Sequence, residues 1–345
     1  MNNKIIYFDR NENNYGPAPK CFDILKNADL TKISFYSKVF TKGVKSILSE
    51  RLAKEFDIDE KNVLLGYGAE DLLKQVVQCY MNESQKIMIP TYSWWYYKAM
   101  ADEVNGQNVE YPLIEGEDTF YYDVKAMLEL FKKEKPSVVL ISSPNNPTGN
   151  SLSKENLFKV LEAFKDAVMV LDEAYWYDSS NEYVKGLIQK YPNLIVIRTF
   201  SKYYALAGMR IGFALVGENH KNLAKFTNRY LGFNRLNEEV AIAALDSADY
   251  YHSIADKMCE DRQLYYDELG KLPGFKVFKS NANFILVKIP EEIKVPLKEF
   301  LTGKNLIVKF MNEELLNSHL RISLGTQEQN RMVIDAIKEF CKSNL

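Results

Sequence analysis

The chain has 345 residues, of which 46% are hydrophobic and 26% charged, with a formal net charge of −2. This length predicts one large and one smaller domain, and the composition supplies enough apolar residues for folded cores. Acidic and basic residues are interleaved along the chain, so we expect neither nucleic acid nor an anionic membrane as a partner.

The cysteines and the apolar runs indicate the compartment. Cys21, Cys79, Cys259 and Cys341 lie far apart and form no CxxC pair. This spacing predicts reduced, mostly buried thiols, and neither a disulfide framework nor a metal site. No apolar run at the N-terminus has the length of a signal peptide, and we expect no membrane-spanning segment. We therefore expect a cytoplasmic protein.

Residues 62–216 alternate short β-rich apolar runs with amphipathic stretches. The runs predict strands at 62–65, 86–89, 108–111, 137–141, 168–171, 194–198 and 211–216. Helices are predicted between several of them, at 70–80, 122–133 and 154–164. Strand and helix alternating at this spacing favour an α/β fold with a mostly parallel seven-stranded sheet, covered on both faces.

The C-terminal third has a different pattern. It predicts one long helix over 237–269, strands at 275–278, 284–288, 307–310 and 320–323, and helices at 295–302 and 329–340. This order indicates a smaller α+β domain. We predict an N-terminal arm at 1–35, a large domain at 36–236 and a small domain at 237–345 that packs with the N-terminal segment.

Four polar segments, 65–71, 142–149, 170–175 and 198–212, each begin where a predicted strand ends. In open α/β sheets, ligands bind at the carboxyl ends of the strands, so these segments should converge on one crevice. In the first segment, Gly66 and Gly68 precede a helix, whose N-terminus can bind an anion. In the second segment, Asn146 lies between two prolines that restrict the backbone. Tight or rigid turns without a ligand would explain both segments as well.

The other two segments carry charge. Asp172 ends an apolar strand, where a carboxylate is costly to bury unless it meets a cation or hydrogen-bond donors. A helix N-cap is the alternative explanation for it. Lys202 lies among hydroxyls, eight residues before Arg210. Lysine forms Schiff bases with carbonyl compounds, and arginine suits phosphate oxygens. A surface lysine is the alternative, against which its apolar and aromatic neighbours argue.

In this order and spacing, the four segments resemble the pyridoxal phosphate (PLP)-dependent aminotransferases of fold type I, class I/II. Asn-Glu-Asn-Asn-Tyr-Gly-Pro at 11–17 is similar to the opening of the histidinol-phosphate aminotransferase-like branch, and Leu-Arg-Ile-Ser-Leu-Gly-Thr at 320–326 ends the similarity. The resemblance covers essentially the whole chain. It implies the PLP transferase fold of type I, with a large domain and a smaller one, and PLP as the cofactor.

The resemblance also implies roles for individual residues toward the cofactor. Lys202 would hold PLP as a Schiff base and shuttle a proton, and Asp172 would pair with the pyridinium nitrogen. Tyr175 and Asn146 would hydrogen-bond the phenolic oxygen. Tyr92 would stack on the ring, with Trp94 and Trp95 as alternatives. The residues expected at the cofactor phosphate are Ala69, Glu70, Thr199, Ser201 and Arg210.

On the substrate side, the resemblance implies that Arg321 binds the carboxylate of the amino donor, with Asn146 nearby. Tyr15, Tyr36 and Lys309 would contact a substrate phosphate, and Tyr36 would come from the partner of a homodimer. Lys309 stands where the branch usually has an arginine, so it keeps the charge but loses the two-pronged geometry.

These residues predict transamination between glutamate and a small phosphorylated ketone. The ketone is either imidazole acetol phosphate, as in the histidinol-phosphate branch, or a smaller relative such as dihydroxyacetone phosphate. The alternative is a PLP-dependent decarboxylase of a phosphorylated amino acid, because such decarboxylases share this branch.

Overall fold

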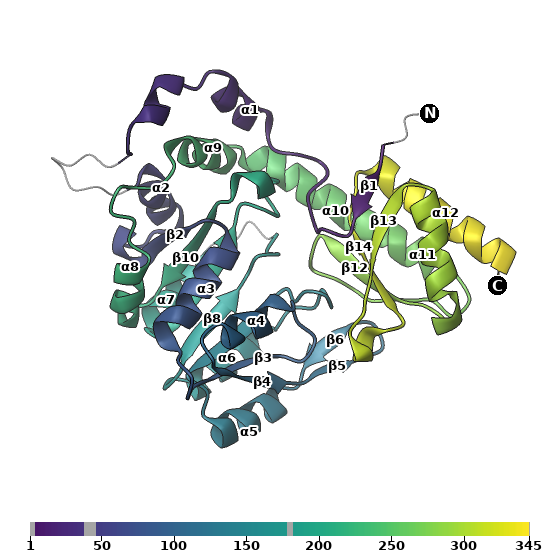
Figure 1. The fold of residues 1–345 in the computed structure, drawn as a ribbon, viewed down its shortest axis with the longest axis horizontal. Helices are drawn as coiled ribbons and strands as arrows, with labels where there is room; N and C mark the ends of the chain where they lie inside the picture. The colour runs from purple at the N-terminus through teal and green to yellow at the C-terminus, as the bar shows by residue number, and fades with distance from the viewer. Residues whose placement is uncertain (1–3, 38–45, 178–181, 345) are drawn as a thin grey trace.

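The computed structural model describes residues 4–37, 46–177 and 182–344, which form two main sheets with their covering helices (Figure 1). The larger sheet has seven strands in the order β2-β10-β9-β8-β7-β3-β4. Their bounds are β2 Val63–Gly66, β3 Lys86–Pro90, β4 Gln107–Tyr111, β7 Val138–Ser142, β8 Val168–Asp172, β9 Leu194–Thr199 and β10 Gly212–Val216. Each of these strands was predicted from the sequence. Only β10 runs antiparallel to its neighbours, which confirms a mostly parallel sheet.

Side chains along these strands alternate between two apolar cores. In β7, Val138 and Leu140 enter one core, whereas Val139 and Ile141 enter the other. The first core is covered by α3 (Ala69–Tyr80), α4 (Tyr96–Asp102) and α8 (Lys221–Phe226). The second is covered by α2 (Ile47–Phe56), α5 (Val124–Glu134), α6 (Lys154–Ala163), α7 (Glu182–Lys190) and α9 (Arg235–Leu245). The alternation is that expected of strands buried on both faces.

The smaller sheet has five strands in the order β1-β13-β14-β12-β11. Their bounds are β1 Ile6–Phe8, β11 Lys276–Val277, β12 Phe284–Lys288, β13 Leu306–Phe310 and β14 His319–Ser323. It packs on α11 (Lys294–Gly303), α12 (Gln327–Asn344) and part of α10 (Ala248–Leu269). In Figure 1 the purple β1 lies beside the yellow-green β13, with which it pairs in parallel. The N-terminal strand therefore belongs to the C-terminal sheet.

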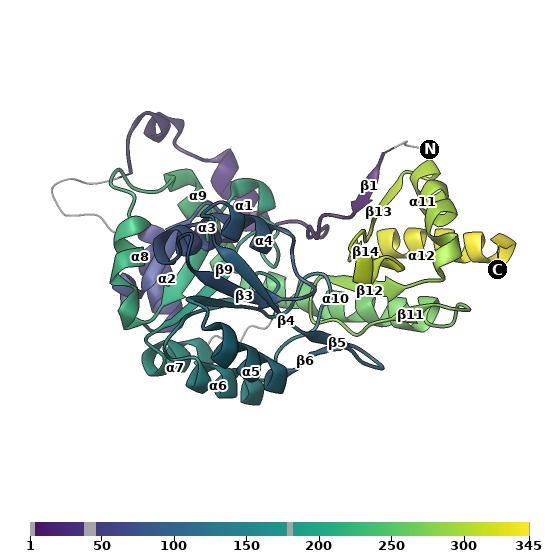
Figure 2. The same cartoon turned by 60° about the horizontal axis from the view of Figure 1, so that its bottom comes forward.

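The helix α10 connects the two units, as Figure 2 shows. Its Tyr251 belongs to the apolar core of the large sheet, and Ile254 and Met258 belong to that of the small sheet. The predicted domain limits at 35 and 236 stay predictions. No helix within the described ranges combines the length and the hydrophobicity needed to cross a membrane.

Two local predictions were wrong. The helix expected over 237–269 is interrupted between α9 and α10, where the Ser247 hydroxyl donates to the Ala243 carbonyl at 2.7 Å and competes with the helical pattern. Tyr122, expected to start a helix, ends a hairpin of β5 (Leu113–Glu115) and β6 (Phe120–Tyr122). The helix begins after it because the Asp123 side chain accepts from the Ala126 amide at 3.0 Å.

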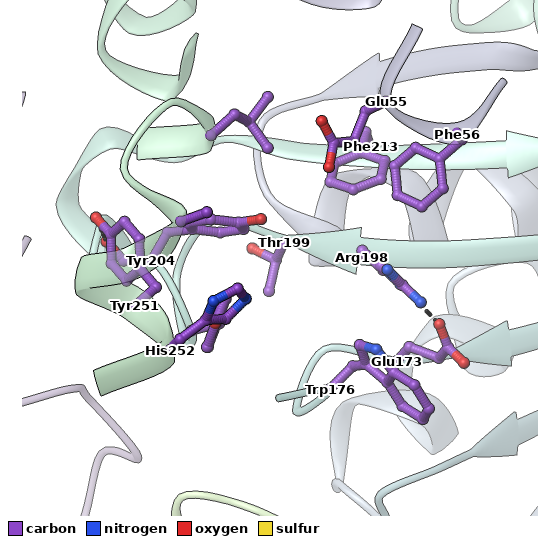
Figure 3. A pocket seen from close by; sticks show the side chains of 13 residues that line it. Glu55, Phe56, Glu173, Trp176, Arg198, Thr199, Tyr204, Phe213, Tyr251 and His252 are labelled. Carbon is purple, nitrogen blue, oxygen red and sulfur yellow. Dashed lines mark hydrogen bonds and ion pairs between the residues drawn. The ribbon is translucent and has the colours of Figure 1, made fainter. Parts of the chain in front are cut away.

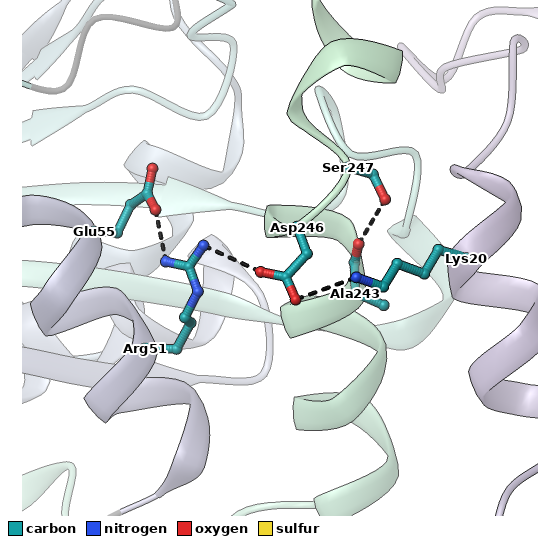
Figure 4. Close-up of polar contacts among 6 residues, drawn as sticks. All are labelled: Lys20, Arg51, Glu55, Ala243, Asp246 and Ser247. Carbon is teal, nitrogen blue, oxygen red and sulfur yellow. Dashed lines mark hydrogen bonds and ion pairs between the residues drawn. The ribbon is translucent and has the colours of Figure 1, made fainter.

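A surface charge network links the N-terminal arm to the large unit (Figure 4). Asp246 accepts from Lys20 of α1 (Pro19–Lys26) at 3.4 Å and from Arg51 at 3.3 Å, and Arg51 also contacts Glu55 at 2.6 Å. Exposed pairs of this kind contribute at most about 1 kcal/mol each. The arm is held mainly by apolar packing, since Cys21 of α1 is buried in the same core as α9.

Replacing Phe8 by alanine should unfold the small sheet more easily. Phe8 is 0% exposed in the core of that sheet, and a Phe→Ala change in a core costs about 3–5 kcal/mol. Urea denaturation would measure the change in the free energy of unfolding. Met332→Ala, at a side chain 46% exposed on α12, is the control and should change it by less than about 1 kcal/mol. If the two substitutions lower the free energy of unfolding equally, β1 does not contribute to the stability of the small sheet as proposed.

Candidate active site

A cavity of about 460 Å³ lies where β8 and β9 end, bordered by β13, β14 and the segment that follows β1. Eleven of the residues predicted from the sequence line it: Ala69, Glu70, Asn146, Asp172, Tyr175, Thr199, Ser201, Lys202, Arg210, Lys309 and Arg321. The cavity therefore brings together all four polar segments with the last strand of the small sheet. Convergence at the carboxyl ends of the strands is the geometry expected of ligand sites in α/β folds.

Asp172 is a buried carboxyl group at the bottom of the cavity. It is 4% exposed, and accepts hydrogen bonds from the Tyr97 hydroxyl at 2.7 Å and the Ala174 amide at 2.9 Å. Burial raises the pKa of Asp172, and the two hydrogen bonds oppose that shift. No ion pair with another described residue is found for it. A cation in the cavity would stabilise its ionised form.

Lys202 extends into the cavity from the turn after β9. Its Nζ donates to the Arg10 carbonyl at 3.3 Å and lies 5.4 Å from the centroid of the Tyr175 ring. The Tyr175 hydroxyl accepts from Asn11 Nδ2 at 3.1 Å. The amine thus faces the segment that follows β1, and no carboxylate among the described residues forms an ion pair with it.

A cradle for an anion lies between the start of α3 and the turn before β10. Gly68 precedes α3 with φ +87°, and a Cβ there would come within 2.7 Å of Arg210 Nη2. At Gly212, a Cβ would come within 2.4 Å of the Gly68 carbonyl carbon. Glycine is therefore required at both positions. The first amides of α3 have no partners within the helix, and with Arg210 they suit a phosphate group.

The hydroxyls of Thr199 and Ser201 lie 3.0 Å apart at the same end of the cavity. The Ser201 amide also donates to the Thr199 hydroxyl at 3.1 Å, so the turn after β9 holds both side chains in place. These two donors add to the amides of α3, since hydroxyls can turn toward phosphate oxygens.

Lys309 and Arg321 form a pair of cations on the small sheet. They are direct partners in the register of β13 and β14, so both side chains lie on the sheet face that borders the cavity. Arg321 is 9% exposed and donates to Asn146 Oδ1 at 2.5 Å and to the Asp9 carbonyl at 2.7 Å. Its Nε is buried without a partner. Two adjacent cations, one with an unused donor, suit an anionic ligand group.

Tyr92 is not among the residues that line the cavity. Its ring packs edge-on against Phe120, with centroids 5.3 Å apart. Trp94 and Trp95, the alternatives for ring stacking, do line the cavity. Phe120 belongs to β6, which sequence reasoning had missed, so the apolar partner of Tyr92 was not foreseen.

Tyr15 and Tyr36 also lie outside the cavity lining. The Tyr15 hydroxyl donates to Asp261 Oδ2 at 2.6 Å. Tyr36 is 67% exposed and lines a separate cavity with Tyr67 and Phe233. Their contacts with substrate stay predictions. For Tyr36 this placement is consistent with the expectation that it acts in the partner's site rather than in its own.

Sequence reasoning missed Tyr97 and Arg10 as residues of this site. Tyr97 follows four other aromatic residues in the run Tyr-Ser-Trp-Trp-Tyr-Tyr at 92–97, and its hydroxyl reaches Asp172 from helix α4. Arg10 precedes the Asn-Glu-Asn motif and lines the cavity, with its guanidinium 3.8 Å from the centroid of Tyr7. A polar or aromatic residue next to a recognised motif was the available signal in both cases.

The fold is shared with solved fold type I PLP enzymes. A structure of histidinol-phosphate aminotransferase from Sinorhizobium meliloti, in complex with pyridoxal-5'-phosphate, superposes with a TM-score of 0.86 at 24% identity, covering 99% of this chain and 92% of that one. L-threonine-O-3-phosphate decarboxylase from Porphyromonas gingivalis gives a TM-score of 0.81 at 21% identity, with 98% and 100% covered. At these identities the likeness shows the fold.

Sequence comparison gives the family. The model of aminotransferase class I and II matches residues 3–337. Histidinol-phosphate aminotransferase of Clostridium botulinum is 32% identical over 348 residues, covering 98% of this chain and 92% of the relative. Histidinol-phosphate aminotransferase 2 of Archaeoglobus fulgidus is 32% identical over 337 residues, with 97% and 93% covered. The chain belongs to the family of class I and II aminotransferases, which are PLP-dependent enzymes.

Replacing Tyr97 by phenylalanine should weaken PLP binding. The change removes the hydroxyl that donates to Asp172, and a hydrogen bond to a charged group contributes about 1.5–3 kcal/mol. We expect the dissociation constant of PLP to rise at least about tenfold. Absorbance titration of the apoprotein would measure it. Tyr111→Phe, which removes a buried hydroxyl bonded to the Leu140 carbonyl, is the control and should leave the constant unchanged.

Proposed function

We propose that the protein is a PLP-dependent aminotransferase that moves an amino group between glutamate and a small phosphorylated ketone. The observation that carries the proposal is the arrangement of Lys309 and Arg321. They lie side by side on one face of the small sheet, at the edge of a cavity that also contains Lys202 and Asp172.

The residues present fit PLP. Asp172 is a buried carboxyl group without an ion pair among the described residues, and a protonated pyridine nitrogen is a cation of the right size for it. Asn146 and Tyr175 would hydrogen-bond the phenolic oxygen. The Gly68 cradle, with Ala69, Glu70, Thr199, Ser201 and Arg210, would hold the phosphate. When bound, PLP supplies an electron-accepting ring that makes a proton on the substrate's Cα easier to remove.

Lys202 has two tasks in this proposal. Its amine would hold the cofactor, and after release by the incoming amino group it would take the proton from the substrate's Cα. A lysine performs such base chemistry only when it is neutral. The hydrogen bond from its Nζ to the Arg10 carbonyl directs the amine toward the segment that follows β1, at the cavity lining.

Lys309 and Arg321 would orient the substrate through its anionic groups. Arg321 donates to Asn146 and to a backbone carbonyl, which hold its guanidinium in place at the cavity lining, where it would bind a carboxylate. Lys309 adds a second charge beside it, so that a phosphate can be bound in the acceptor half of the reaction. Either imidazole acetol phosphate or dihydroxyacetone phosphate satisfies these contacts.

We also propose that the protein acts as a homodimer. Leu30, Ile33, Phe35 and Tyr36 are four exposed apolar side chains within seven residues of the chain, at 66%, 71%, 74% and 67% exposure. Apolar residues concentrated in this way mark an interaction surface. A second copy would cover them and bring Tyr36 to the partner's site. A cytoplasmic location is supported by the four cysteines, all of which are free.

Lys202→Ala should abolish the reaction with glutamate. With the wild-type enzyme, added glutamate should bleach the absorbance of the bound cofactor and form 2-oxoglutarate, because the amino group moves to the cofactor. The variant should show neither change, since the amine that takes the proton is absent. Lys221→Ala, at an exposed lysine of α8, is the control.

The outcomes of the glutamate experiment also separate the candidate reactions. A wild-type enzyme that is inert toward glutamate would refute transamination from this donor. If a phosphorylated amino acid releases carbon dioxide without forming a keto acid, the decarboxylase alternative is favoured instead.

Lys309→Ala should raise KM for the phosphorylated ketone about ten- to a hundredfold, because one charged hydrogen bond of about 1.5–3 kcal/mol is lost. The KM for glutamate should change less than about threefold if Lys309 serves mainly the phosphate. Lys309→Arg should restore most of the affinity. Lys298→Ala, at an exposed lysine of α11, is the control. Steady-state kinetics across a panel of phosphorylated ketones would measure these constants and identify the acceptor. Equal effects on both substrates would contradict the phosphate assignment.

A further inference from the structure

A buried ion pair lies behind the site, outside the lining of the 460 Å³ cavity. Arg198 Nε donates to Glu173 Oε2 at 2.7 Å, with the two side chains 9% and 2% exposed. Figure 3 shows the pair beside Phe56 and Trp176, at the wall of a small cavity of about 70 Å³. Each member is the chain neighbour of a site residue, because Glu173 follows Asp172 and Arg198 precedes Thr199.

The alternation of strand side chains explains why the pair and the site residues face opposite ways. In β8, Val170 enters the core under α3 and α4, and Leu171 enters the other core. Asp172 therefore points to the α3 and α4 face. By the same count in β9, Thr199 shares that face and Arg198 has the opposite one.

Several contacts hold the pair at the ends of β8 and β9. The Tyr183 hydroxyl donates to Glu173 and accepts from Arg198 Nη2 at 3.3 Å. The Arg198 guanidinium carbon lies 5.4 Å from the ring centroids of both Phe56 and Trp176. The Glu173 amide donates to the Ile197 carbonyl at 2.9 Å, which extends the pairing of the two strands by one residue.

Stability alone does not account for a pair of this kind. Apolar side chains of similar volume at a buried ion pair usually leave stability unchanged or improve it. Unlike an apolar contact, an ion pair requires a defined distance and orientation of its two side chains. It can therefore set the spacing and the rotation of the two strand ends. Burial alone would lower the pKa of the Arg198 guanidinium, but the interactions with Glu173 and Tyr183 outweigh this and raise the pKa.

We propose that Glu173 and Arg198 are positioning residues, which lock the end of β8 to the end of β9 and so hold Asp172 at the distance from Thr199 and Lys202 that the cofactor requires. The proposal rests on the proposed function, because it assumes that PLP occupies the cavity. A displacement of about 1 Å in such a site lowers activity about a hundredfold, although the residues that move the strand ends touch no ligand.

The test is a double variant, E173M/R198M, that replaces the pair by apolar side chains. Because the pair is expected to be neutral for stability, the apo form should melt within a few degrees of the wild type. The dissociation constant of PLP should nevertheless rise about tenfold or more, and the pH midpoint of the bound cofactor's absorbance should move. A double variant with wild-type affinity and midpoint would overturn the proposal.

The control is E134M/K86M, which removes a second ion pair of the large sheet. Lys86 Nζ and Glu134 Oε2 lie 2.8 Å apart at the amino end of β3, away from the site. Replacing them should leave the PLP affinity and the pH midpoint of the absorbance unchanged. If E173M/R198M fails to fold, Tyr183→Phe replaces it, since that change removes only one hydroxyl from the pair. It should weaken PLP binding about two- to threefold, and an unchanged constant would overturn the proposal.

The two proposals fail in different ways. A wild-type protein that binds no PLP would refute the proposed function. A wild type that binds PLP, beside variants that bind it equally well, would refute only the positioning role of Glu173 and Arg198.

Discussion

The burial of one carboxyl group governs the site. Asp172 ends a strand that is covered on both faces, and its hydrogen-bond partners among the described residues are a tyrosine hydroxyl and a backbone amide. Such a group is costly in its ionised form unless a cation occupies the space in front of it. The elements around Asp172 form the rest of the cavity. Helix α4 supplies Tyr97, the turn after β9 supplies Lys202, and β13 and β14 of the small sheet supply Lys309 and Arg321. In the proposed function, the pyridinium nitrogen of PLP is the cation that offsets this cost.

The second constraint is the period of two along a strand. It places Asp172 and Thr199 on one face of the large sheet, and leaves Glu173 and Arg198 for the other. The neighbouring strands β8 and β9 therefore carry candidate site residues on one face of the sheet. On the other face they carry the ion pair that we propose fixes the position of their ends. No additional loop is needed to carry Glu173 and Arg198, because they are the chain neighbours of the site residues that we propose they position.

The sequence predicted the elements that a local pattern signals. It did not predict those that depend on contacts between residues far apart in the chain. The strands of the large sheet and the residues at their carboxyl ends were predicted, because apolar runs and turn residues signal both. β1 and the hairpin of β5 and β6 were missed, since short strands lack a periodic signal and depend on partners far along the chain. The packing of Tyr92 shows the same limit, because its ring contacts Phe120 of the missed hairpin; its stacking on the cofactor stays a prediction. Tyr97 was missed because its contact with Asp172 depends on how α4 packs.

The pairing of β1 with β13 has a consequence for how the chain acquires its structure. Residues 6–8 are synthesised long before their partners at 306–308. The small sheet can close only after residues 306–308 have been made, and contacts of such long range are slow to form. The segment that carries Asn11 and the carbonyl that holds Lys202 has to wait for that closure. We therefore expect the candidate cavity to be completed after the large sheet, whose part of the chain contributes most of its lining residues.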